Sequence, residues 1–287
     1  MSTQPQPRQL QGAGIGVRAP WWLGRALHVA GLATVAVILV SIAATSSGAD
    51  ARAYWAADTA HPYGAIYESA GAYLYSPAFL QVIAPLRLLP FGLFFAAWVA
   101  INGAVLVWLT GPVIAALLLL PASYSPVWVD LWFGNITILL AAATVIGFRY
   151  PGAWSFMLLT KVTPGVGLVW FAVRREWRAL LIAGGVTLLV VTMSFAISPT
   201  AWIDWIDNLR ANAARPEVPG GDGSSLGLRL AAAAVVIAVG ARIGAWWAVP
   251  IGLFVAQPAA WFIGFNLFLV WIAVARRSWM APPGRVR

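Results

Sequence analysis

The sequence predicts an all-α polytopic membrane protein, and three observations support this fold class. Apolar residues make up 61% of the 287 residues and charged residues only 9%, whereas soluble domains carry roughly 25% charged residues. Several apolar stretches are long enough to cross a hydrocarbon core of about 30 Å as helices. The 17 Trp and 7 Tyr residues suit the aromatic belts at membrane interfaces. This composition excludes a water-soluble fold.

The start of the chain sets the expected orientation. Residues 1–25 are rich in Gln, Pro, Gly and Arg and contain no acidic residue, which is typical of a disordered cytoplasmic tail. The run from Leu27 to Thr45 is long enough for a first span. Ala43 to Ser46 could imitate a signal-peptide cleavage site, but the apolar run exceeds the usual length of a signal-peptide core. We therefore expect a retained first helix that starts inside.

Residues 26–278 are predicted to form one transmembrane domain of about ten helices, with both termini cytoplasmic. Polar segments predict outer loops at about 47–91, 123–134 and 198–225. Prolines interrupt the apolar segment Ser76 to Pro90, which favours an interfacial helix within the first outer loop. Residues 279–287 form a cytoplasmic tail.

The remaining spans follow from the alternation of apolar runs and basic residues. Between Arg149 and Arg174 we expect a hairpin of two short helices that carries Lys161 to the outer side. Trp202 to Trp205 indicates an amphipathic interfacial helix in the third outer loop. The other expected spans are Phe91 to Leu109, Pro112 to Ala122, Asn135 to Phe148, Leu180 to Ile197, Leu226 to Ala241, Ile243 to Gln257 and Ala259 to Ala275.

The acidic residues give the first indication of function. In this topology every acidic residue except Glu176 lies outside, although the positive-inside rule concerns only Lys and Arg. The chain has no Cys and two His, which excludes thiol catalysis and thiolate metal sites. No carboxylate cluster with convincing ligand spacing appears, so we expect neither a metal nor a cofactor. The basic residues are spread between apolar stretches, which argues against nucleic acid as a partner.

A series of short motifs follows the first span. Asp50 and Tyr54 form an Asp-x-x-x-Tyr element, and Tyr73 to Pro77 gives Tyr-Leu-Tyr-Ser-Pro. In this order, the motifs resemble glycosyltransferase family 87 (the DUF2029 group), a family of polyprenyl-phosphate-dependent enzymes of the GT-C class. The further elements that carry the resemblance are Leu89-Pro90, Asn102, Lys161 with Pro164, and the basic group Arg174 to Arg178. Two elements depart from the family pattern: Gly134-Asn135-Ile136-Thr137 replaces Gly-Gln-x-Asn, and Gly223 to Leu226 lacks the Asn of Asn-x-Ser-Leu.

The resemblance covers about residues 48–178 well and the remainder weakly, and it implies an activity. It implies inverting transfer of a sugar, mannose in the first instance, from a polyprenyl-phosphate donor to a glycolipid or cell-wall polysaccharide. Family members also transfer arabinofuranose. The expected location is a bacterial plasma membrane with the active site facing outside, and the partners are membrane lipid, donor and acceptor.

Asp50 and Lys161 are the main candidate site residues. Such a transfer needs a base for the acceptor hydroxyl, and a carboxylate just above the bilayer can serve; Asp50 is the candidate for this base. Lys161 is the only Lys in the chain, and its ammonium can neutralise the leaving phosphate. The alternatives are a solvated loop Asp and a Lys that snorkels to the interface.

Further residues are candidates for binding. Tyr73 and Tyr75 could stack on a sugar or simply belong to an aromatic belt. Arg52 could supply a second cation for the donor phosphate, or be a solvated charge. The possible additional polar contacts are Asp58, Asp130, Asn135 and Thr137, of which Asn135 could equally cap a helix.

Two other functions stay open at this point. The C-terminal half is short for the family, which would suit an inactive GT-C-like membrane subunit. A small-solute or lipid transporter would also be polytopic and often carries intramembrane charge. However, no two halves of this chain repeat with broken helices at matching places, as many carriers show.

Overall fold

A computed structural model of the chain describes residues 20–59, 61–63, 72–120, 125–213, 225–257 and 262–277. Within these ranges every regular element is a helix, so the all-α prediction is confirmed. Most of the predicted N-terminal tail and the predicted C-terminal tail lie outside the described residues. Glu68, in the predicted first outer loop, also lies outside the described residues.

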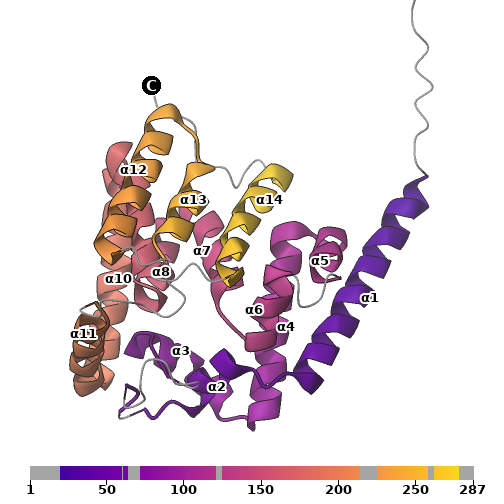
Figure 1. The fold of residues 1–287 in the computed structure, drawn as a ribbon, viewed down its shortest axis with the longest axis horizontal. Coiled ribbons are helices and arrows are strands. Elements are labelled where there is room, and N and C mark those ends of the chain that lie inside the picture. Colours follow the sequence, from indigo (N-terminus) through magenta and orange to yellow (C-terminus); the bar gives the residue numbers. More distant parts are fainter. Residues whose placement is uncertain are drawn as a thin grey trace, which may run out of the picture.

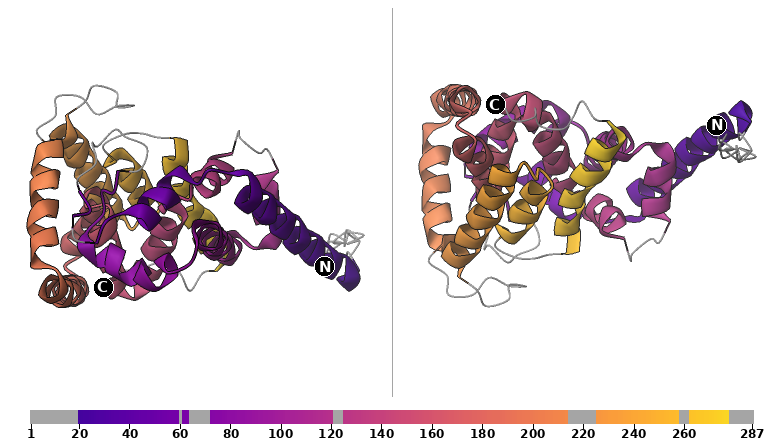
Figure 2. Two further views of the ribbon diagram at one scale, coloured as in Figure 1. Left: turned by 90° about the horizontal axis from the view of Figure 1, so that it is seen from below. Right: turned by 90° about the horizontal axis from the view of Figure 1, so that it is seen from above.

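The first helix is α1 (Trp21–Thr45), which begins six residues before the expected Leu27. Pro20 is extended at its N-cap, and Trp21 and Trp22 then continue the apolar run as helix. Figure 2 shows α1 projecting from the rest of the molecule. Only Gly31, Val35 and Ile42 of this helix are buried, so most of its apolar surface is free to face lipid.

The other elements follow α1 in a compact arrangement of long and short helices. They are α2 (Ala49–Ala56), α3 (Pro77–Arg87), α4 (Phe91–Thr110), α5 (Pro112–Leu119), α6 (Pro126–Phe133), α7 (Thr137–Arg149), η2 (Pro151–Ala153), α8 (Trp154–Thr160), η3 (Thr163–Leu168), α9 (Val169–Val173), α10 (Trp177–Ile197), α11 (Pro199–Ala213), α12 (Leu226–Ile243), α13 (Ala248–Val255), η4 (Phe262–Phe268) and α14 (Leu269–Arg276).

The predicted count of about ten spans is not confirmed. In the described residues, α1, α4, α10 and α12 are long and apolar enough to cross a membrane, and a fifth span results if α6 and α7 are counted together. The last expected span forms a shorter apolar helix, Phe262–Arg276, and several others form helices of only 7 or 8 residues, such as α5, α8 and α13. A helix of that length rises only about 12 Å. These segments are apolar because they pack inside the protein, where backbone breaks near membrane depth are tolerated.

The predicted loops contain more helix than expected. Residues 123–134 were predicted as an outer loop, but α6 occupies most of this segment because its apolar residues Val127 and Leu131 are buried in the core. A helix is present where an interfacial helix was predicted in the first loop, namely α3. Likewise, α11 contains the Trp202 to Trp205 stretch.

The two ends of the molecule differ in character. Figure 1 shows α2, α3 and α11 together at one end, while the first residues of α1 and the last residues of α14 lie at the opposite end. Arg276 is the last residue of α14 at that opposite end, and it donates to the carbonyl oxygen of Leu109 at the end of α4. We call the end formed by α2, α3 and α11 the loop end.

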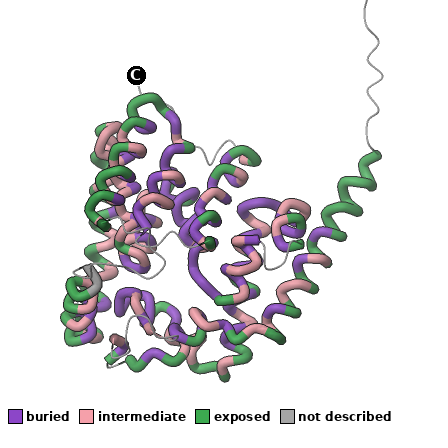
Figure 3. The backbone as a smooth tube through the Cα atoms, viewed as in Figure 1, coloured by how far each residue is buried: buried purple, intermediate pink, exposed green. Residues whose placement is uncertain are grey.

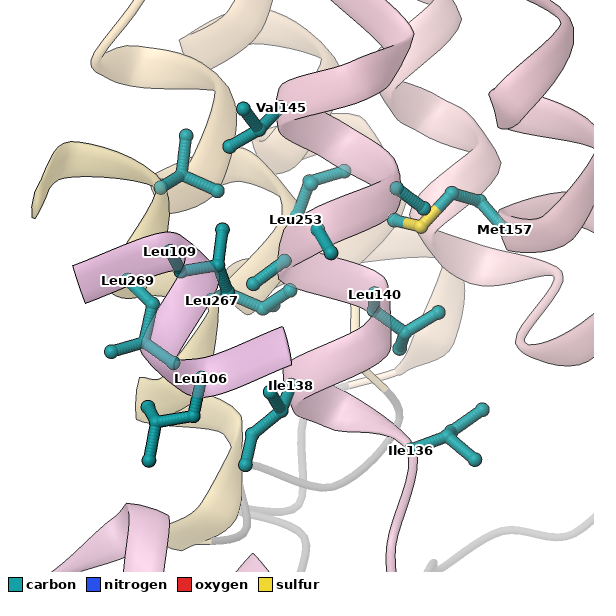
Figure 4. Close-up of a cluster of buried hydrophobic side chains, with 14 of the residues drawn as sticks. Leu106, Leu109, Ile136, Ile138, Leu140, Val145, Met157, Leu253, Leu267 and Leu269 are labelled. Carbon is teal, nitrogen blue, oxygen red and sulfur yellow. The ribbon is translucent and has the colours of Figure 1, made fainter. Parts of the chain in front are cut away.

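The core lies around α7. Buried residues concentrate on α4, α7 and the C-terminal helices (Figure 3). In the close-up, Ile138, Leu140 and Val145 of α7 lie among Leu106 and Leu109 of α4 and Leu253, Leu267 and Leu269 of the C-terminal elements (Figure 4). Since lipid is as apolar as these side chains, close packing rather than hydrophobic burial holds such helices together. This packing fixes the start of α7, where the polar residues gather.

Candidate functional site

The turn from α1 to α2 positions Asp50. Gly48 has φ +56°, a left-handed conformation that favours glycine. A Cβ at this position would also lie 2.7 Å from the ring of Phe95, so a side chain would clash there. The backbone N–H of Gly48 donates to Ser46 Oγ at 3.0 Å, and Ser46 Oγ in turn donates to the carbonyl oxygen of Trp132. These contacts place Asp50 in the first turn of α2, beside the end of α6.

A sharp bend between α6 and α7 brings the second set of polar residues to the same place. The two helix axes differ in direction by 111°. Gly134 ends α6 with φ +71°, and its carbonyl oxygen accepts a hydrogen bond from Trp98 Nε1 at 2.8 Å. The Asn135 N–H donates to the carbonyl oxygen of Asp130 at 2.9 Å. We call residues 134–137 the elbow.

Asn135 joins the elbow to Asp50. Its side-chain Nδ2 lies 2.6 Å from Asp50 Oδ2. Its Oδ1 accepts two hydrogen bonds, from the Ile136 N–H at 2.8 Å and from Thr137 Oγ1 at 2.9 Å. Two residues that were only possible polar contacts, Asn135 and Thr137, therefore form one network with Asp50.

Asp130 lies directly behind the elbow. Its side chain is only 1% exposed, and Oδ2 accepts hydrogen bonds from the Ile138 N–H at 3.1 Å and from Asn266 Nδ2 at 2.8 Å. The bond to Ile138 satisfies a backbone donor in the first turn of α7. Asp130 was predicted in the second outer loop as a possible polar contact; in the structure it belongs to α6, and its buried side chain braces the start of α7.

Lys161 reaches this site from a distant part of the chain. It follows α8, whose last turn is tied to the start of α3 by a hydrogen bond from the Ser76 N–H to the carbonyl oxygen of Leu159 at 3.2 Å. The charge of Lys161 acts on both Asp50 and Asp130. Within the described residues Lys161 forms no ion pair closer than 4.0 Å. The break between α8 and η3 thus leaves a cation close to two carboxylates without direct contact.

Burial and neighbouring charges affect the Asp50 carboxyl in opposite directions. Partial burial raises the pKa of Asp50, whereas the hydrogen bond from Asn135 and the charge of Lys161 lower it. Burial is the larger influence, and the net result is a raised pKa. A carboxylate with a raised pKa is a better proton acceptor at neutral pH than an ordinary solvated Asp.

The structure places the predicted tyrosines inside the protein. Tyr73 is buried and its hydroxyl donates to the carbonyl oxygen of Ser76 at 2.8 Å. Tyr75 is also buried, and its hydroxyl lies 3.1 Å from that of Tyr54. Tyr54 and Tyr75 meet edge to face, with centroids 5.2 Å apart. These rings fix the path of the chain between the first outer loop and α3, so their faces are not open surfaces for a sugar.

Two predicted charged residues lie away from the Asn135 network. The exposed Arg52 has its guanidinium 3.9 Å from the centroid of the Phe91 ring. Asp58 is exposed after the end of α2, where its charge acts on Arg87. Neither side chain is among the influences on the Asp50 carboxyl.

Sequence reasoning did not identify Asn266. This residue of η4 is 2% exposed and its Nδ2 donates to the carbonyl oxygen of Pro126 at 3.0 Å as well as to Asp130. A sequence signal existed, because an Asn within the apolar run Phe262 to Phe268 needs a polar partner at membrane depth. Which partner it takes follows only from the fold. In the described residues no group of three or more metal-ligating side chains occurs.

The fold and this site define a helical membrane protein in which the charge of a lysine after α8 acts on a carboxylate at the start of α2. The model of glycosyltransferase family 87 matches residues 73–287, which is more than half of the chain. The chain therefore belongs to glycosyltransferase family 87, and it is a membrane glycosyltransferase by family. Comparison with curated proteins and with solved structures gives no match.

The matched range corrects one expectation and limits another. The resemblance was expected to fade after about residue 178, but the family match continues through the C-terminal half. The family match begins only at Tyr73, so it does not include Asp50. The role of Asp50 therefore rests on its hydrogen bond with Asn135 and on the charge of Lys161. Both of these residues lie in the matched range.

Proposed function

We propose that this chain transfers a sugar from a polyprenyl-phosphate donor to a hydroxyl of a glycolipid or cell-wall polysaccharide at the outer membrane face. The observation that carries the proposal is that the charge of Lys161 acts on the Asp50 carboxyl group. These residues are far apart in the chain, and Lys161 is its only Lys. A base and a cation are the two groups that this reaction needs.

In the proposed reaction the acceptor hydroxyl attacks the anomeric carbon from the face opposite the phosphate. Asp50 takes the hydroxyl proton as the new C–O bond forms. The bond between the anomeric carbon and the phosphate oxygen breaks, and its electron pair leaves with the polyprenyl phosphate. Lys161 stabilises the charge that develops on that phosphate. The product has the inverted anomeric configuration, because the attack is a single displacement.

The sugar proposed first is mannose, with arabinofuranose as the alternative, because both occur in the family that the sequence resembles. The location proposed is a bacterial plasma membrane, with the loop end facing outside and both termini in the cytoplasm. This orientation is supported by the common position of the start of α1 and the end of α14 opposite α2 and α11 (Figure 1).

The test is sugar transfer in reconstituted vesicles with polyprenyl-phosphate mannose and polyprenyl-phosphate arabinose. Asp50→Asn should reduce kcat by a factor of about 100 or more, because the amide cannot take a proton. Lys161→Ala should also reduce kcat strongly. Asp58→Asn is the matched control, since this exposed carboxylate belongs to the same loop and does not act on Asp50.

Three outcomes distinguish the alternatives. Transfer that is lost in Asp50→Asn and kept in Asp58→Asn supports the proposal. Absence of transfer from either donor by the native chain overturns it and favours an inactive subunit. Solute flux without release of polyprenyl phosphate favours a transporter.

A further inference from the structure

The amide of Asn135 has only one orientation compatible with its surroundings. The Ile136 backbone N–H can only donate, and it lies 2.8 Å from one terminal atom of the Asn135 side chain. That atom must therefore be the carbonyl oxygen Oδ1. The other atom is the nitrogen of the NH2 group, which can only donate, and it lies 2.6 Å from Asp50 Oδ2.

This orientation makes the two oxygens of Asp50 unequal. The Asn135 NH2 group occupies one lone pair of Oδ2. Oδ1 has no hydrogen-bond partner within the described residues, so both of its lone pairs are free, and a proton received on Oδ1 leaves the bond to Asn135 undisturbed.

From this geometry we infer that Asn135 is a positioning residue for proton transfer: it holds Asp50 Oδ2, so that the proton of the acceptor hydroxyl is received on Oδ1. The inference rests on the proposed function and deepens it. Asn135 acts through Asp50 and does not itself contact the reacting atoms. The proton leaves the acceptor oxygen as that oxygen bonds to the anomeric carbon, and it ends on Oδ1.

The elbow gives Asn135 the rigidity that such a role needs. Thr137 Oγ1 adds a second donor to its Oδ1 at 2.9 Å, and the Asn135 N–H is fixed on the carbonyl oxygen of Asp130. The residue is only 8% exposed, so water competes little for its amide. A side chain with its backbone and carbonyl oxygen both held can keep a neighbouring carboxylate within the narrow range that catalysis needs.

The charged and titratable groups around Asp50 are few, which makes the effect of Asn135 measurable. Asp130 faces it from α6, Lys161 from the segment after α8, and Tyr54 from its own helix. Helix α4, which packs against α2, carries no charged side chain. Arg52 of α2 lies over the Phe91 ring. None of these groups is altered by a substitution at Asn135.

The experiment compares the native chain with Asn135→Leu and Asn135→Gln. In Asn135→Leu the carboxylate loses its donor, so kcat should fall by a factor of about 10 to 100 while KM for donor and acceptor stays within about twofold. The acidic limb of the pH profile should move to higher pH, because a hydrogen bond that favours the charged form is gone. Asn135→Gln keeps an amide donor. It should therefore retain part of the native kcat, and its acidic limb should lie closer to that of the native chain.

Thr144→Val is the matched control. Thr144 is buried in the same helix α7, and its hydroxyl bonds only to the carbonyl oxygen of Leu140 within that helix. This substitution also removes a buried hydrogen bond from α7 but leaves the elbow intact. Thr144→Val should change neither kcat nor the position of the acidic limb of the pH profile.

A second readout does not depend on activity. Carbodiimide coupling modifies protonated carboxyl groups, and peptide mass spectrometry can follow modification at Asp50 as a function of pH. The labelling curve of Asp50 should move to higher pH in Asn135→Leu and stay in place in Thr144→Val. Unchanged curves, together with a kcat no lower than that of Thr144→Val, overturn the positioning role while leaving the proposed function intact. No transfer by the native chain overturns both.

Discussion

The side-chain amide of Asn266 bridges Asp130 Oδ2 at 2.8 Å and the carbonyl oxygen of Pro126 at 3.0 Å. Pro126 is the first residue of α6 and Asp130 lies one turn later, so a single side chain from η4 spans the first turn of that helix. The C-terminal part of the chain thereby stabilises α6 and the elbow. Loss of this contact should destabilise α6, the start of α7 and the position of Asn135.

Asn266→Leu should therefore destabilise the protein. The substitution leaves Asp130 buried with one donor fewer, and an under-satisfied buried acceptor costs about 1–3 kcal/mol. The midpoint of thermal unfolding in detergent should fall, and sugar transfer should weaken with it. Thr144→Val is a suitable comparison because it also removes a buried polar group near the core. An equal midpoint for both variants would contradict a special role for the bridge.

Gly134→Ala should disturb the contact between α2 and the elbow. Gly134 has φ +71°, and a Cβ there would lie 2.6 Å from the Cβ of Ala51, next to Asp50. The backbone strain alone costs about 1–2 kcal/mol, and the clash must push α2 away. We expect lower stability and a fall in kcat of at least about tenfold, since a displacement of about 1 Å at a reacting group is costly.

Gly244→Ala separates these two effects. Gly244 has nearly the same conformation, φ +74°, but a Cβ there meets nothing within 4 Å. This variant should lose stability through strain alone and keep its kcat. If Gly134→Ala and Gly244→Ala behave alike in kcat, the packing of Ala51 on the elbow does not position Asp50.

The pH dependence of transfer should report Asp50. Burial raises the pKa of this carboxyl, so activity should be full above the raised pKa and fall as pH decreases through it. Lys161→Gln removes a charge that lowers this pKa, and the acidic limb should then move to still higher pH. Profiles of kcat/KM against pH measure the limb. Arg210→Gln, at an exposed arginine paired with Asp207 on α11, should leave it unmoved.

The orientation in the membrane can be tested by labelling, because the chain has no native Cys. Asp58→Cys and Asp207→Cys place single thiols at exposed positions of the loop end, and Arg178→Cys places one at the exposed start of α10. A membrane-impermeant maleimide should label the first two from outside the cell. Arg178→Cys should react only after permeabilisation. Labelling in the opposite pattern would invert the proposed topology.

Much of the helical fold can be predicted from the sequence, because a long apolar run between basic residues is expected to form a transmembrane helix. The runs ending at Thr45, Leu109 and Ile197 correspond to α1, α4 and α10 with small differences at their ends. The shorter apolar runs were predicted as spans because composition does not distinguish lipid from protein surroundings. In α5, α8 and α13 the apolar residues pack against other helices, and glycines such as Gly111 and Gly134 break the backbone.

The candidate site could be predicted in its members but not in its connections. Asp50, Lys161 and Asn135 were singled out by charge, by rarity and by motif order. Their contacts depend on a bend of 111° after a left-handed glycine, which no hydrophobic pattern encodes. Tyr73 and Tyr75 are residues typical of an aromatic belt, yet both lie in the core. Tyr75 packs edge to face on Tyr54 and Phe79, and Tyr73 packs edge to face on Tyr75.

The close approach of α1 to α5 at Gly31 has a consequence for Asp50, which follows the C-terminal end of α1. A Cβ on Gly31 would lie 2.8 Å from the backbone of Pro112, so the two main chains touch there without a side chain between them, as small residues allow in membranes. From Gly31 to Thr45 the helix is about 21 Å long at 1.5 Å per residue. A rod of that length pivoting by about 3° moves its far end by about 1 Å, the scale on which misplacement of a reacting group slows catalysis. A change in the packing of α1 at Gly31 would therefore alter the position of Thr45, five residues before Asp50, and with it the turn that holds the carboxylate.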